Sequence, residues 1–314
     1  MEKEKIETWY HYTDFEKFKC ILANGTLRFK CSTQSNDILD TRYFVDLLNE
    51  SNLSDLCEAP EDLAALNEFC ASYFKSESYH PKIAAYVACF TEIKDSRLLW
   101  DAYTMNRPKN ENAEEKCAPK YNGVIIGFNA EKIRALIQQY DDKPEFAKAY
   151  VTPIIYGQTG QLQLLGVSFW DFDNLLEEIR RDSDQTQILT TSITGGNASI
   201  STKKYLIEAK SYLIERIETL APAMKHEFWQ EEKEVRAILC RDSSSGNQDE
   251  VEKGEGNNRY IDLPITEDMI ETIVLGPEFG EAEEKELNAM TNAKIQFANL
   301  NHEKSKGTGI TRYR

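Results

Sequence analysis

Two short apolar runs constrain the fold of this chain more than any other feature. Residues 86–90 and 124–128 are compact stretches of aliphatic, β-branched and aromatic side chains. Runs of this length and composition are typical of buried strands. We therefore expect both segments to lie near the centre of a β-sheet.

Further strand and helix patterns surround these two runs. Strands are predicted at residues 7–12, 26–30, 150–156, 234–240, 260–263 and 270–275. Thr13 and Glu16 have the spacing of a capping box, which would start a helix that Asn24 and Gly25 end. Other helices are predicted at 60–74, after an N-cap at Asn129, and shortly after residue 277. The fold class that follows is α+β.

Two segments differ in character from the rest of the chain. Residues 158–222 are mostly helical in pattern, and we interpret them as an inserted helical layer. Residues 241–259 are rich in Ser, Gly, Asn and acidic side chains, which predicts a flexible, solvated hairpin loop. A chain of 314 residues could form one elaborated domain or two small ones. We favour a single domain, 1–314, that carries these two insertions.

The charge balance excludes some classes of partner. The chain has 37 basic and 53 acidic residues, a net charge of −16, which disfavours a surface that tracks nucleic-acid phosphates or anionic lipid. The sequence contains neither a run long enough for a membrane span nor an apolar stretch like that of a signal peptide, so we expect a cytoplasmic protein. Seven cysteines without C-x-x-C spacing predict thiols, and four scattered histidines give no reason to expect a metal site.

The predicted strand at 234–240 carries one candidate site. Its period of two places Glu234 and Arg236 on one face, and Glu232 would join that face if the strand began earlier. Such a row can hold a sugar hydroxyl or stabilise positive charge that grows on a ribose carbon. The alternative is a surface ladder in which glutamate and arginine only pair with each other.

The aromatic strand at the N-terminal end carries a second candidate. Alternation separates Trp9 and His11 from Tyr10 and Tyr12. His11 could hydrogen-bond to a ligand hydroxyl, or it could be a structural histidine at the boundary of the core. The simplest role for Thr13, which follows, is that of a helix cap.

A third segment offers aromatic side chains. Trp100 and Tyr103 are three residues apart and would share one face of a helical turn. Packing explains the pair, although a flat aromatic ring can also stack on nicotinamide or adenine. The chain has no G-x-G-x-x-G, G-K-[ST] or G-x-S-x-G motif, so classical dinucleotide folds and serine-hydrolase elbows have no support.

The order of several short motifs resembles one bacterial family, the domain-of-unknown-function 2971 family. The resemblance spans about residues 8–280 and rests on Tyr10-His11-Tyr12-Thr13, Asn36-Asp37, Cys89-Phe90-Thr91-Glu92, Trp100 with Tyr103, residues 123–128, Trp229-x-x-Glu232-x-Glu234-x-Arg236 and Leu275-Gly276-Pro277. The chain departs from the family pattern at two positions. Ile38 stands where the family often has proline, and Val235 stands where it often has tryptophan.

That family looks related to the ADP-ribosyltransferase fold, a split β-sandwich that binds NAD in a cleft. The resemblance implies that His11 would hydrogen-bond the adenosine ribose and that Tyr103 would stack near nicotinamide. It implies that Glu234 or Glu232 is catalytic, binding the nicotinamide ribose and stabilising the oxocarbenium-like transition state. Arg236 would orient that glutamate or contact a phosphate. Tyr12, Thr13 and Trp100 complete the NAD-binding candidates.

The expected function is therefore cleavage of the nicotinamide bond of NAD, which here is a substrate. ADP-ribose would pass to a macromolecule, either protein or nucleic acid, or to water, in a toxin or a phage-defence effector. The alternative is a non-catalytic module that binds a nucleotide or a protein on the same fold, because catalytic function belongs to the site and not to the fold.

Overall fold

The structure is a computed structural model that describes residues 7–32, 81–106, 120–121, 123–167, 200–243, 251–255, 258–276, 281–291 and 293–297, with positions 43, 47, 72–74 and 279. Of the helix predicted at 60–74, only the last three residues are described, and they are helical. The motif Asn36-Asp37 lies outside the described residues.

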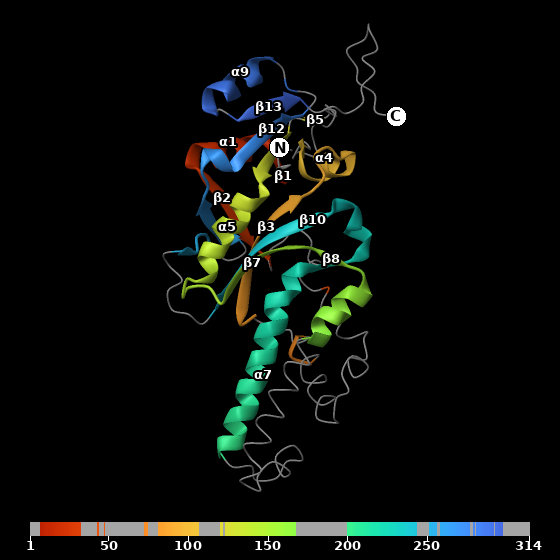
Figure 1. The fold of residues 1–314 in the computed structure, drawn as a ribbon, viewed down its shortest axis with the longest axis vertical. Coiled ribbons are helices and arrows are strands. Elements are labelled where there is room, and N and C mark those ends of the chain that lie inside the picture. Colours follow the sequence, from red (N-terminus) through yellow and green to blue (C-terminus); the bar gives the residue numbers. More distant parts are fainter. Residues whose placement is uncertain are drawn as a thin grey trace, which may run out of the picture.

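In the described part of the chain, an open sheet of nine strands forms the centre of the molecule (Figure 1). Its strands are β1 (Thr8–Asp14), β2 (Thr26–Cys31), β3 (Ile83–Thr91), β6 (Gly123–Asn129), β7 (Lys148–Pro153), β10 (Glu234–Asp242), β11 (Tyr260–Pro264), β12 (Ile270–Leu275) and β13 (Lys294–Phe297). The order is β11-β2-β3-β1-β6-β12-β13, with β10 on β3 and β7 beyond β10. Every pairing given for this sheet is antiparallel except that of β12 with β13. The α+β class is therefore confirmed.

The sheet forks at β3, the strand that contains the first apolar run. Strand β10 pairs with β3 along its whole length, from Glu234 opposite Thr91 to Asp242 opposite Ile83. On the other edge of β3, strand β1 meets it at Thr91, whereas β2 meets it at Tyr86 and Val87. The strands β1 and β2 therefore diverge from each other at the middle of β3.

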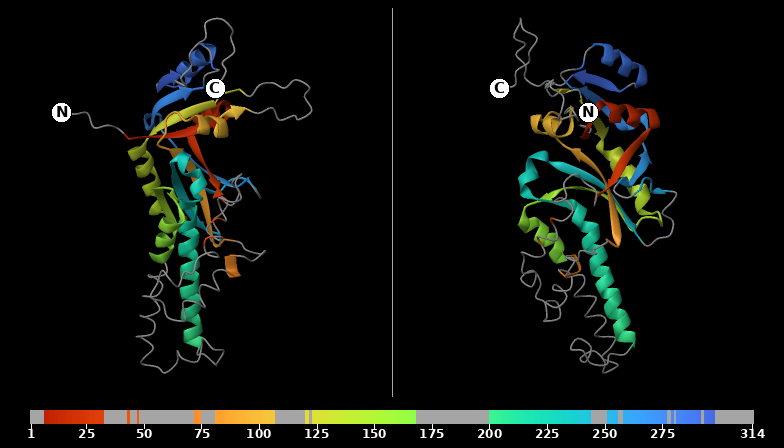
Figure 2. Two further views of the ribbon diagram at one scale, coloured as in Figure 1. Left: turned by 90° about the vertical axis from the view of Figure 1, so that its right-hand side faces the viewer. Right: turned by 180° about the vertical axis from the view of Figure 1, so that it is seen from behind.

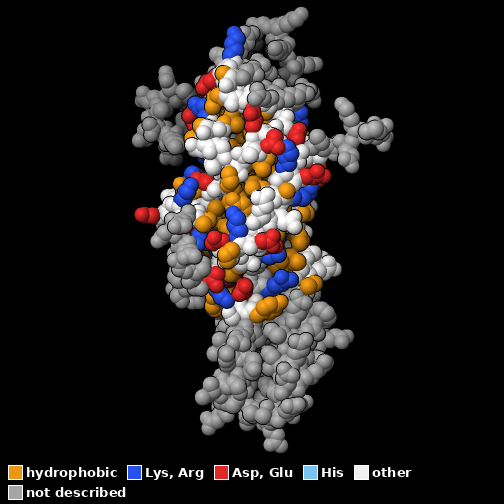
Figure 3. Space-filling model, turned by 60° about the vertical axis from the view of Figure 1, so that its left-hand side comes forward, with side chains coloured by type: hydrophobic (Ala, Val, Ile, Leu, Met, Phe, Trp, Pro, Cys, Tyr) orange, Lys and Arg blue, Asp and Glu red, His pale blue; other side chains and the backbone are white. Residues whose placement is uncertain are grey.

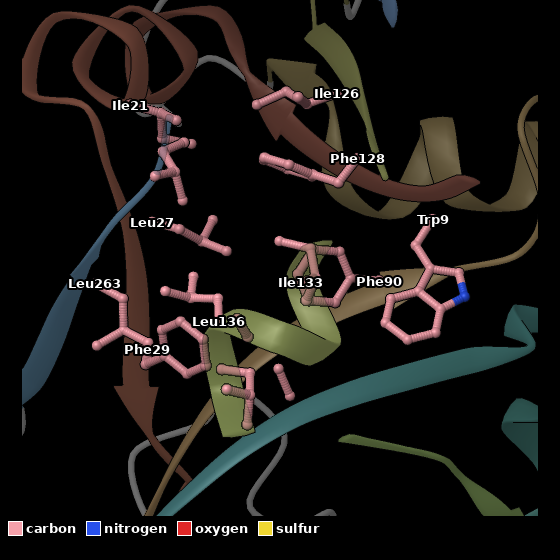
Figure 4. Packing of buried hydrophobic residues seen from close by; sticks show 14 of the residues in the cluster. Trp9, Ile21, Leu27, Phe29, Phe90, Ile126, Phe128, Ile133, Leu136 and Leu263 are labelled. Atoms are coloured by element: carbon pink, nitrogen blue, oxygen red, sulfur yellow. The ribbon is translucent and has the colours of Figure 1, made fainter. Parts of the chain in front are cut away.

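One face of the sheet carries the main hydrophobic core. Helices α1 (Phe15–Asn24), α5 (Ala130–Asp141) and α9 (Glu281–Met290) contribute to it, and Figure 4 shows Ile133 and Leu136 of α5 packed beside Phe90 and Phe128 of the sheet. Burial of this many large apolar side chains is the main stabilising contribution to the fold. Both apolar runs supply residues to this core, as the sequence predicts.

The opposite face is covered by two other helices, α4 (Arg97–Tyr103) and α7 (Ile200–Leu220). Trp100 of α4 packs with Tyr12 and Val274 of the sheet. The Tyr150 hydroxyl of β7 donates a hydrogen bond to the Thr219 carbonyl of α7. Helix α7 extends well past the end of the sheet in both Figure 1 and Figure 2.

Local sequence signals explain where helices α1 and α5 begin or end, although one predicted helix cap is wrong. Asn129 caps α5 by accepting a hydrogen bond from the Lys132 amide, as predicted. Gly25 ends α1 in the left-handed conformation, with φ of 58°. The predicted capping role of Thr13 is wrong, because the N-cap of α1 is Asp14 and Thr13 is a buried residue of β1.

The two predicted insertions are only partly described. Residues 158–167 and α7 are helical, in agreement with the pattern, and residues 168–199 lie outside the described part. Strand β10 includes Arg241 and Asp242, so the strand continues two residues into the segment predicted as a loop. Strand β13 was not predicted.

The distribution of surface charge and the polarity of the helices can be compared with the sequence predictions about nucleic acid, lipid and membranes. Lys and Arg side chains are interspersed with Asp and Glu on the face shown in Figure 3, so this face does not present a field of one sign. Within the described part of the chain, every helix is too short or too polar to cross a membrane.

Candidate functional site

The two candidate glutamates lie on either side of a sharp bend before β10. Glu232 is the last residue of the 3-10 helix η5 (Glu227–Glu232), and Glu234 is the first residue of β10. Lys233 between them is left-handed, with φ of 43°. The strand does not begin earlier than Glu234, so Glu232 does not join its face by alternation. The bend, and not strand alternation, brings the two carboxylates together.

Both carboxylates converge on Lys225 of the short strand β9 (Met224–Lys225). Its Nζ lies 2.7 Å from Glu232 Oε2 and 3.0 Å from Glu234 Oε2. Arg236 completes the group as a bidentate partner of Glu234, with Nε 2.7 Å from Oε1 and Nη2 3.1 Å from Oε2. We call Lys225, Glu232, Glu234 and Arg236 the charge cluster.

The charge cluster is buried and electrically balanced. Its four residues are only 3% to 6% exposed, so the surface ladder considered as the alternative is wrong. Two cations face two anions. Such balance is required because an unpaired charge is very unfavourable in a site of low dielectric constant.

The cluster keeps Glu234 ionised. Burial opposes ionisation of this carboxyl group, but the charge and hydrogen bonds of Arg236, together with Lys225, outweigh that effect and lower its pKa to about 2. The Cys89 side chain adds a further hydrogen bond that acts in the same direction. The third nitrogen of the guanidinium, Nη1, donates to the Pro222 carbonyl at 2.9 Å.

Neighbouring strands fix the backbone of the bend. The Thr91 hydroxyl of β3 donates to the Glu232 carbonyl at 2.6 Å. The Glu234 amide donates to the hydroxyl of Tyr156, on β8 (Ile155–Tyr156), at 3.0 Å. Because β8 pairs with β9 in parallel, with Tyr156 opposite Lys225, a single small ladder positions two partners of the glutamates.

Tyr103 is the predicted aromatic residue that the structure brings to this cluster. Its hydroxyl donates to Glu232 Oε1 at 3.0 Å, although the residue as a whole is 49% exposed. Desolvation of the hydroxyl and the Glu232 charge raise the pKa of Tyr103 well above its ordinary value, so the phenol stays a neutral donor.

Trp100 and Tyr12 have structural positions instead. Trp100 is fully buried, and its Nε1 donates to Asp95 Oδ1 at 2.8 Å. The Tyr12 ring meets the Trp100 ring edge-on at 5.6 Å, and its hydroxyl donates to the Ile93 carbonyl and accepts from the Ser96 amide. Thr13 is also buried and lies opposite Val124 of β6.

His11 lies at the fork of the sheet. Its Nδ1 is 2.8 Å from the Cys89 carbonyl oxygen, which can only accept, so Nδ1 carries the hydrogen. Burial lowers the pKa of His11 against the effect of this hydrogen bond, which favours the neutral ring with Nε2 as an acceptor. The ring packs near Phe90, and the residue lies opposite Ile126, both members of the main core.

Strand β3 connects the glutamates with His11. Tyr10 pairs with Thr91, and Thr91 pairs with Glu234, so alternation places Glu234 on the Tyr10 side of the sheet and His11 on the other side. Cys89 links the two, since its side chain bonds to Glu234 and its carbonyl to His11. The segment that contains His11 and the segment that contains Glu234 therefore both contact Cys89.

Sequence reasoning missed Lys225, Tyr156 and Cys89 as parts of the site. Lys225 carries no motif, and its ladder partner Tyr156 is far away in the sequence. Within the described ranges, no group of three or more His, Cys, Asp or Glu residues could hold a metal ion. The carboxylates of the charge cluster have cationic partners from the protein itself.

Comparison with known proteins finds a family model whose matched range contains the charge cluster. Residues 99–237 match the model of a family described as a protein of unknown function, DUF2971, and this match supports placing the chain in that family. No curated protein and no solved structure matches the chain. The matched range includes Tyr103 and the whole charge cluster and ends one residue after Arg236, whereas His11 lies outside it.

Proposed function

We propose that this chain is an NAD-cleaving enzyme of the ADP-ribosyltransferase type, with its reaction centre at the charge cluster. The observation that carries the proposal is a pair of convergent carboxylates, held by Lys225 and Arg236, with an exposed tyrosine bonded to one of them. Perturbed carboxyl groups that are fixed by specific partners are characteristic of functional sites.

The chemistry requires a fixed negative charge beside a sugar carbon. The bond between C1′ of the ribose and the nicotinamide nitrogen breaks heterolytically, and neutral nicotinamide leaves with the electron pair. The ribose carbon then carries positive charge, which an ionised, preorganised carboxylate stabilises. Water or a nucleophile of a macromolecule attacks C1′ and releases one proton. A carboxyl with the lowered pKa of Glu234 is ionised at every physiological pH.

The fork of the sheet supports the fold part of the proposal. A split β-sandwich of the ADP-ribosyltransferase type binds NAD in a cleft, and the separation of β1 from β2 between Val87 and Thr91 opens the sheet at β3. His11 lies at this fork on the opposite side of the sheet from Glu234, and its neutral ring has Nε2 as a hydrogen-bond acceptor. An NAD-consuming activity of this kind would suit a toxin or a phage-defence effector.

One observation favours a second candidate, a non-catalytic module that binds a nucleotide or a protein. Each of the four carboxylate oxygens of Glu232 and Glu234 already accepts a hydrogen bond from the protein. A purely structural cluster would have the same arrangement. This candidate predicts binding without turnover.

Nicotinamide release from NAD tests the proposal. The purified protein is incubated with NAD, and nicotinamide is quantified for the wild type and for Glu232→Gln and Glu234→Gln, with Glu231→Gln as the control. Glu231 lies in the same 3-10 helix but is exposed, so its variant should release nicotinamide at the wild-type rate. At least one of the variants Glu232→Gln and Glu234→Gln should release nicotinamide about 100-fold more slowly, or slower still.

Two further readouts separate the candidates. Labelled ADP-ribose distinguishes transfer to a macromolecule from hydrolysis, because it ends either bound or free. If wild-type protein releases no nicotinamide but NAD still raises its melting temperature, the binding module replaces the enzyme. Turnover that is indifferent to both glutamate variants would remove the reaction centre from this cluster.

A further inference from the structure

The partners of the four carboxylate oxygens are not equivalent. Glu234 Oε1 accepts from Arg236 Nε, and Oε2 accepts from both Lys225 Nζ and Arg236 Nη2. Glu232 Oε2 accepts from Lys225 Nζ, whereas Glu232 Oε1 accepts from the neutral Tyr103 hydroxyl, so among the described residues it is the one oxygen of the four that is not bonded to a cation. Three of the four oxygens are therefore bonded to buried cations.

Displacing a cation from the cluster is unfavourable for any ligand. Lys225 and Arg236 are at most 5% exposed, so a ligand that took their place would leave a buried charge without compensation. Tyr103 as a residue is 49% exposed and its hydroxyl is neutral, so outward rotation of this side chain would exchange the carboxylate for water without leaving a buried charge unpaired. Glu232 Oε1 is thus the position at which a ligand hydroxyl can enter with the least loss.

The geometry points to Glu232, and not Glu234, as the carboxylate that binds a substrate hydroxyl, in exchange for the hydroxyl of Tyr103. The ligand class is a neutral sugar hydroxyl such as one on the ribose of a nucleotide, because an O–H donor at the 3.0 Å separation of the Tyr103 bond reproduces the bond that is lost. Glu234 then acts as the fixed support that holds Lys225 in place. This inference rests on the proposed function and names the group that contacts the substrate.

In this exchange Tyr103 competes with the substrate for Glu232 Oε1. In the free protein its hydroxyl satisfies the carboxylate, and on binding it competes with the substrate for the same oxygen. Tyr103→Phe removes the competitor without removing the ring. Because a neutral hydrogen bond contributes about 1 kcal/mol net, KM for NAD should fall by about fivefold while kcat stays within about twofold.

The two glutamate variants should differ in which property they lose, turnover or stability. Glu232→Gln leaves Glu234 between its two cations, so the protein should keep most of its stability and lose kcat by about 100-fold. Glu234→Gln removes the carboxylate that Lys225 and Arg236 share, so it should lower the urea midpoint far more than Glu232→Gln does.

The decisive experiment measures binding as well as turnover. Calorimetric titration with ADP-ribose and steady-state kinetics with NAD are carried out on the wild type, Tyr103→Phe and Glu232→Gln. Tyr212→Phe, at an exposed tyrosine on α7, is the matched control and should change neither value. Tighter ADP-ribose binding and lower KM in Tyr103→Phe, with loss of binding in Glu232→Gln, are the expected results.

The outcomes distinguish this inference from the proposed function. If ADP-ribose binding follows the expected pattern but NAD is never cleaved, the exchange at Glu232 stands and the enzymatic proposal fails. If nicotinamide is released but Tyr103→Phe leaves KM and ADP-ribose binding unchanged, the exchange is overturned and the enzymatic proposal stands. Absence of both binding and turnover overturns both.

Discussion

Removal of the Lys225 ammonium is the most informative perturbation of stability. Its Nζ lies 2.7 Å and 3.0 Å from two buried carboxylates, and no more than 6% of any of these three side chains is exposed. In Lys225→Met, the cluster keeps two negative charges but only the one positive charge of Arg236. Removal of one partner of a buried ion pair typically costs about 3–5 kcal/mol, and we expect a loss of unfolding free energy in this range.

Urea denaturation of matched variants measures this loss. Lys132→Met is the control, because Lys132 pairs with Asp268 at the surface and such pairs contribute at most about 1 kcal/mol. The double variant Lys225→Met with Glu232→Gln restores charge balance, so it should be more stable than Lys225→Met alone. A Lys225→Met loss no larger than that of the control, or simple additivity in the double variant, would refute the reasoning.

Three other predictions concern the bend, its ionised carboxyl and a helix cap. The pKa of Glu234 is lowered from 4.5 to about 2, so the contribution of this carboxylate to the free energy of unfolding is fully present above about pH 5 and is lost as pH falls toward 2. Urea titrations of the wild type at different pH values should show up to about 3 kcal/mol of this pH-dependent stability, which Glu234→Gln should lack. Lys233→Gly should raise the free energy of unfolding, measured by urea denaturation, by about 1 kcal/mol, because glycine adopts the left-handed conformation without strain, whereas Lys233→Val should lower this free energy. Asn129→Ala should lower the melting temperature through a loss of about 1 kcal/mol at the α5 cap, and an unchanged value would show that this cap is dispensable.

The strands of the sheet could be predicted because local composition determines them. Residues 86–90 and 124–128 lie within β3 and β6, whose apolar side chains alternate between two packed faces. The N-terminus of α1 was misplaced by one residue, since both Thr13 and Asp14 can act as N-caps. Pairing with β6 decides between them, because β1 stays in register with β6 as far as Asp14, opposite Gly123.

The geometry of the candidate site could be predicted only in part. The sequence identified Glu234 and Arg236 as neighbours on one strand face, which the structure confirms. It could not place Glu232, since lysine has no preference for the left-handed conformation that Lys233 adopts. Lys225 depends on the β8–β9 ladder, a tertiary contact that leaves no local pattern.

The central claim is that NAD is cleaved at the charge cluster, and one paired measurement tests it most directly. Single-turnover nicotinamide release is followed for the wild type, Glu232→Gln and the exposed control Glu231→Gln at equal concentration. The account predicts equal release by the wild type and Glu231→Gln and about 100-fold slower release by Glu232→Gln. Equal rates for all three proteins, or no release by any of them under conditions in which NAD also leaves the melting temperature unchanged, would contradict it.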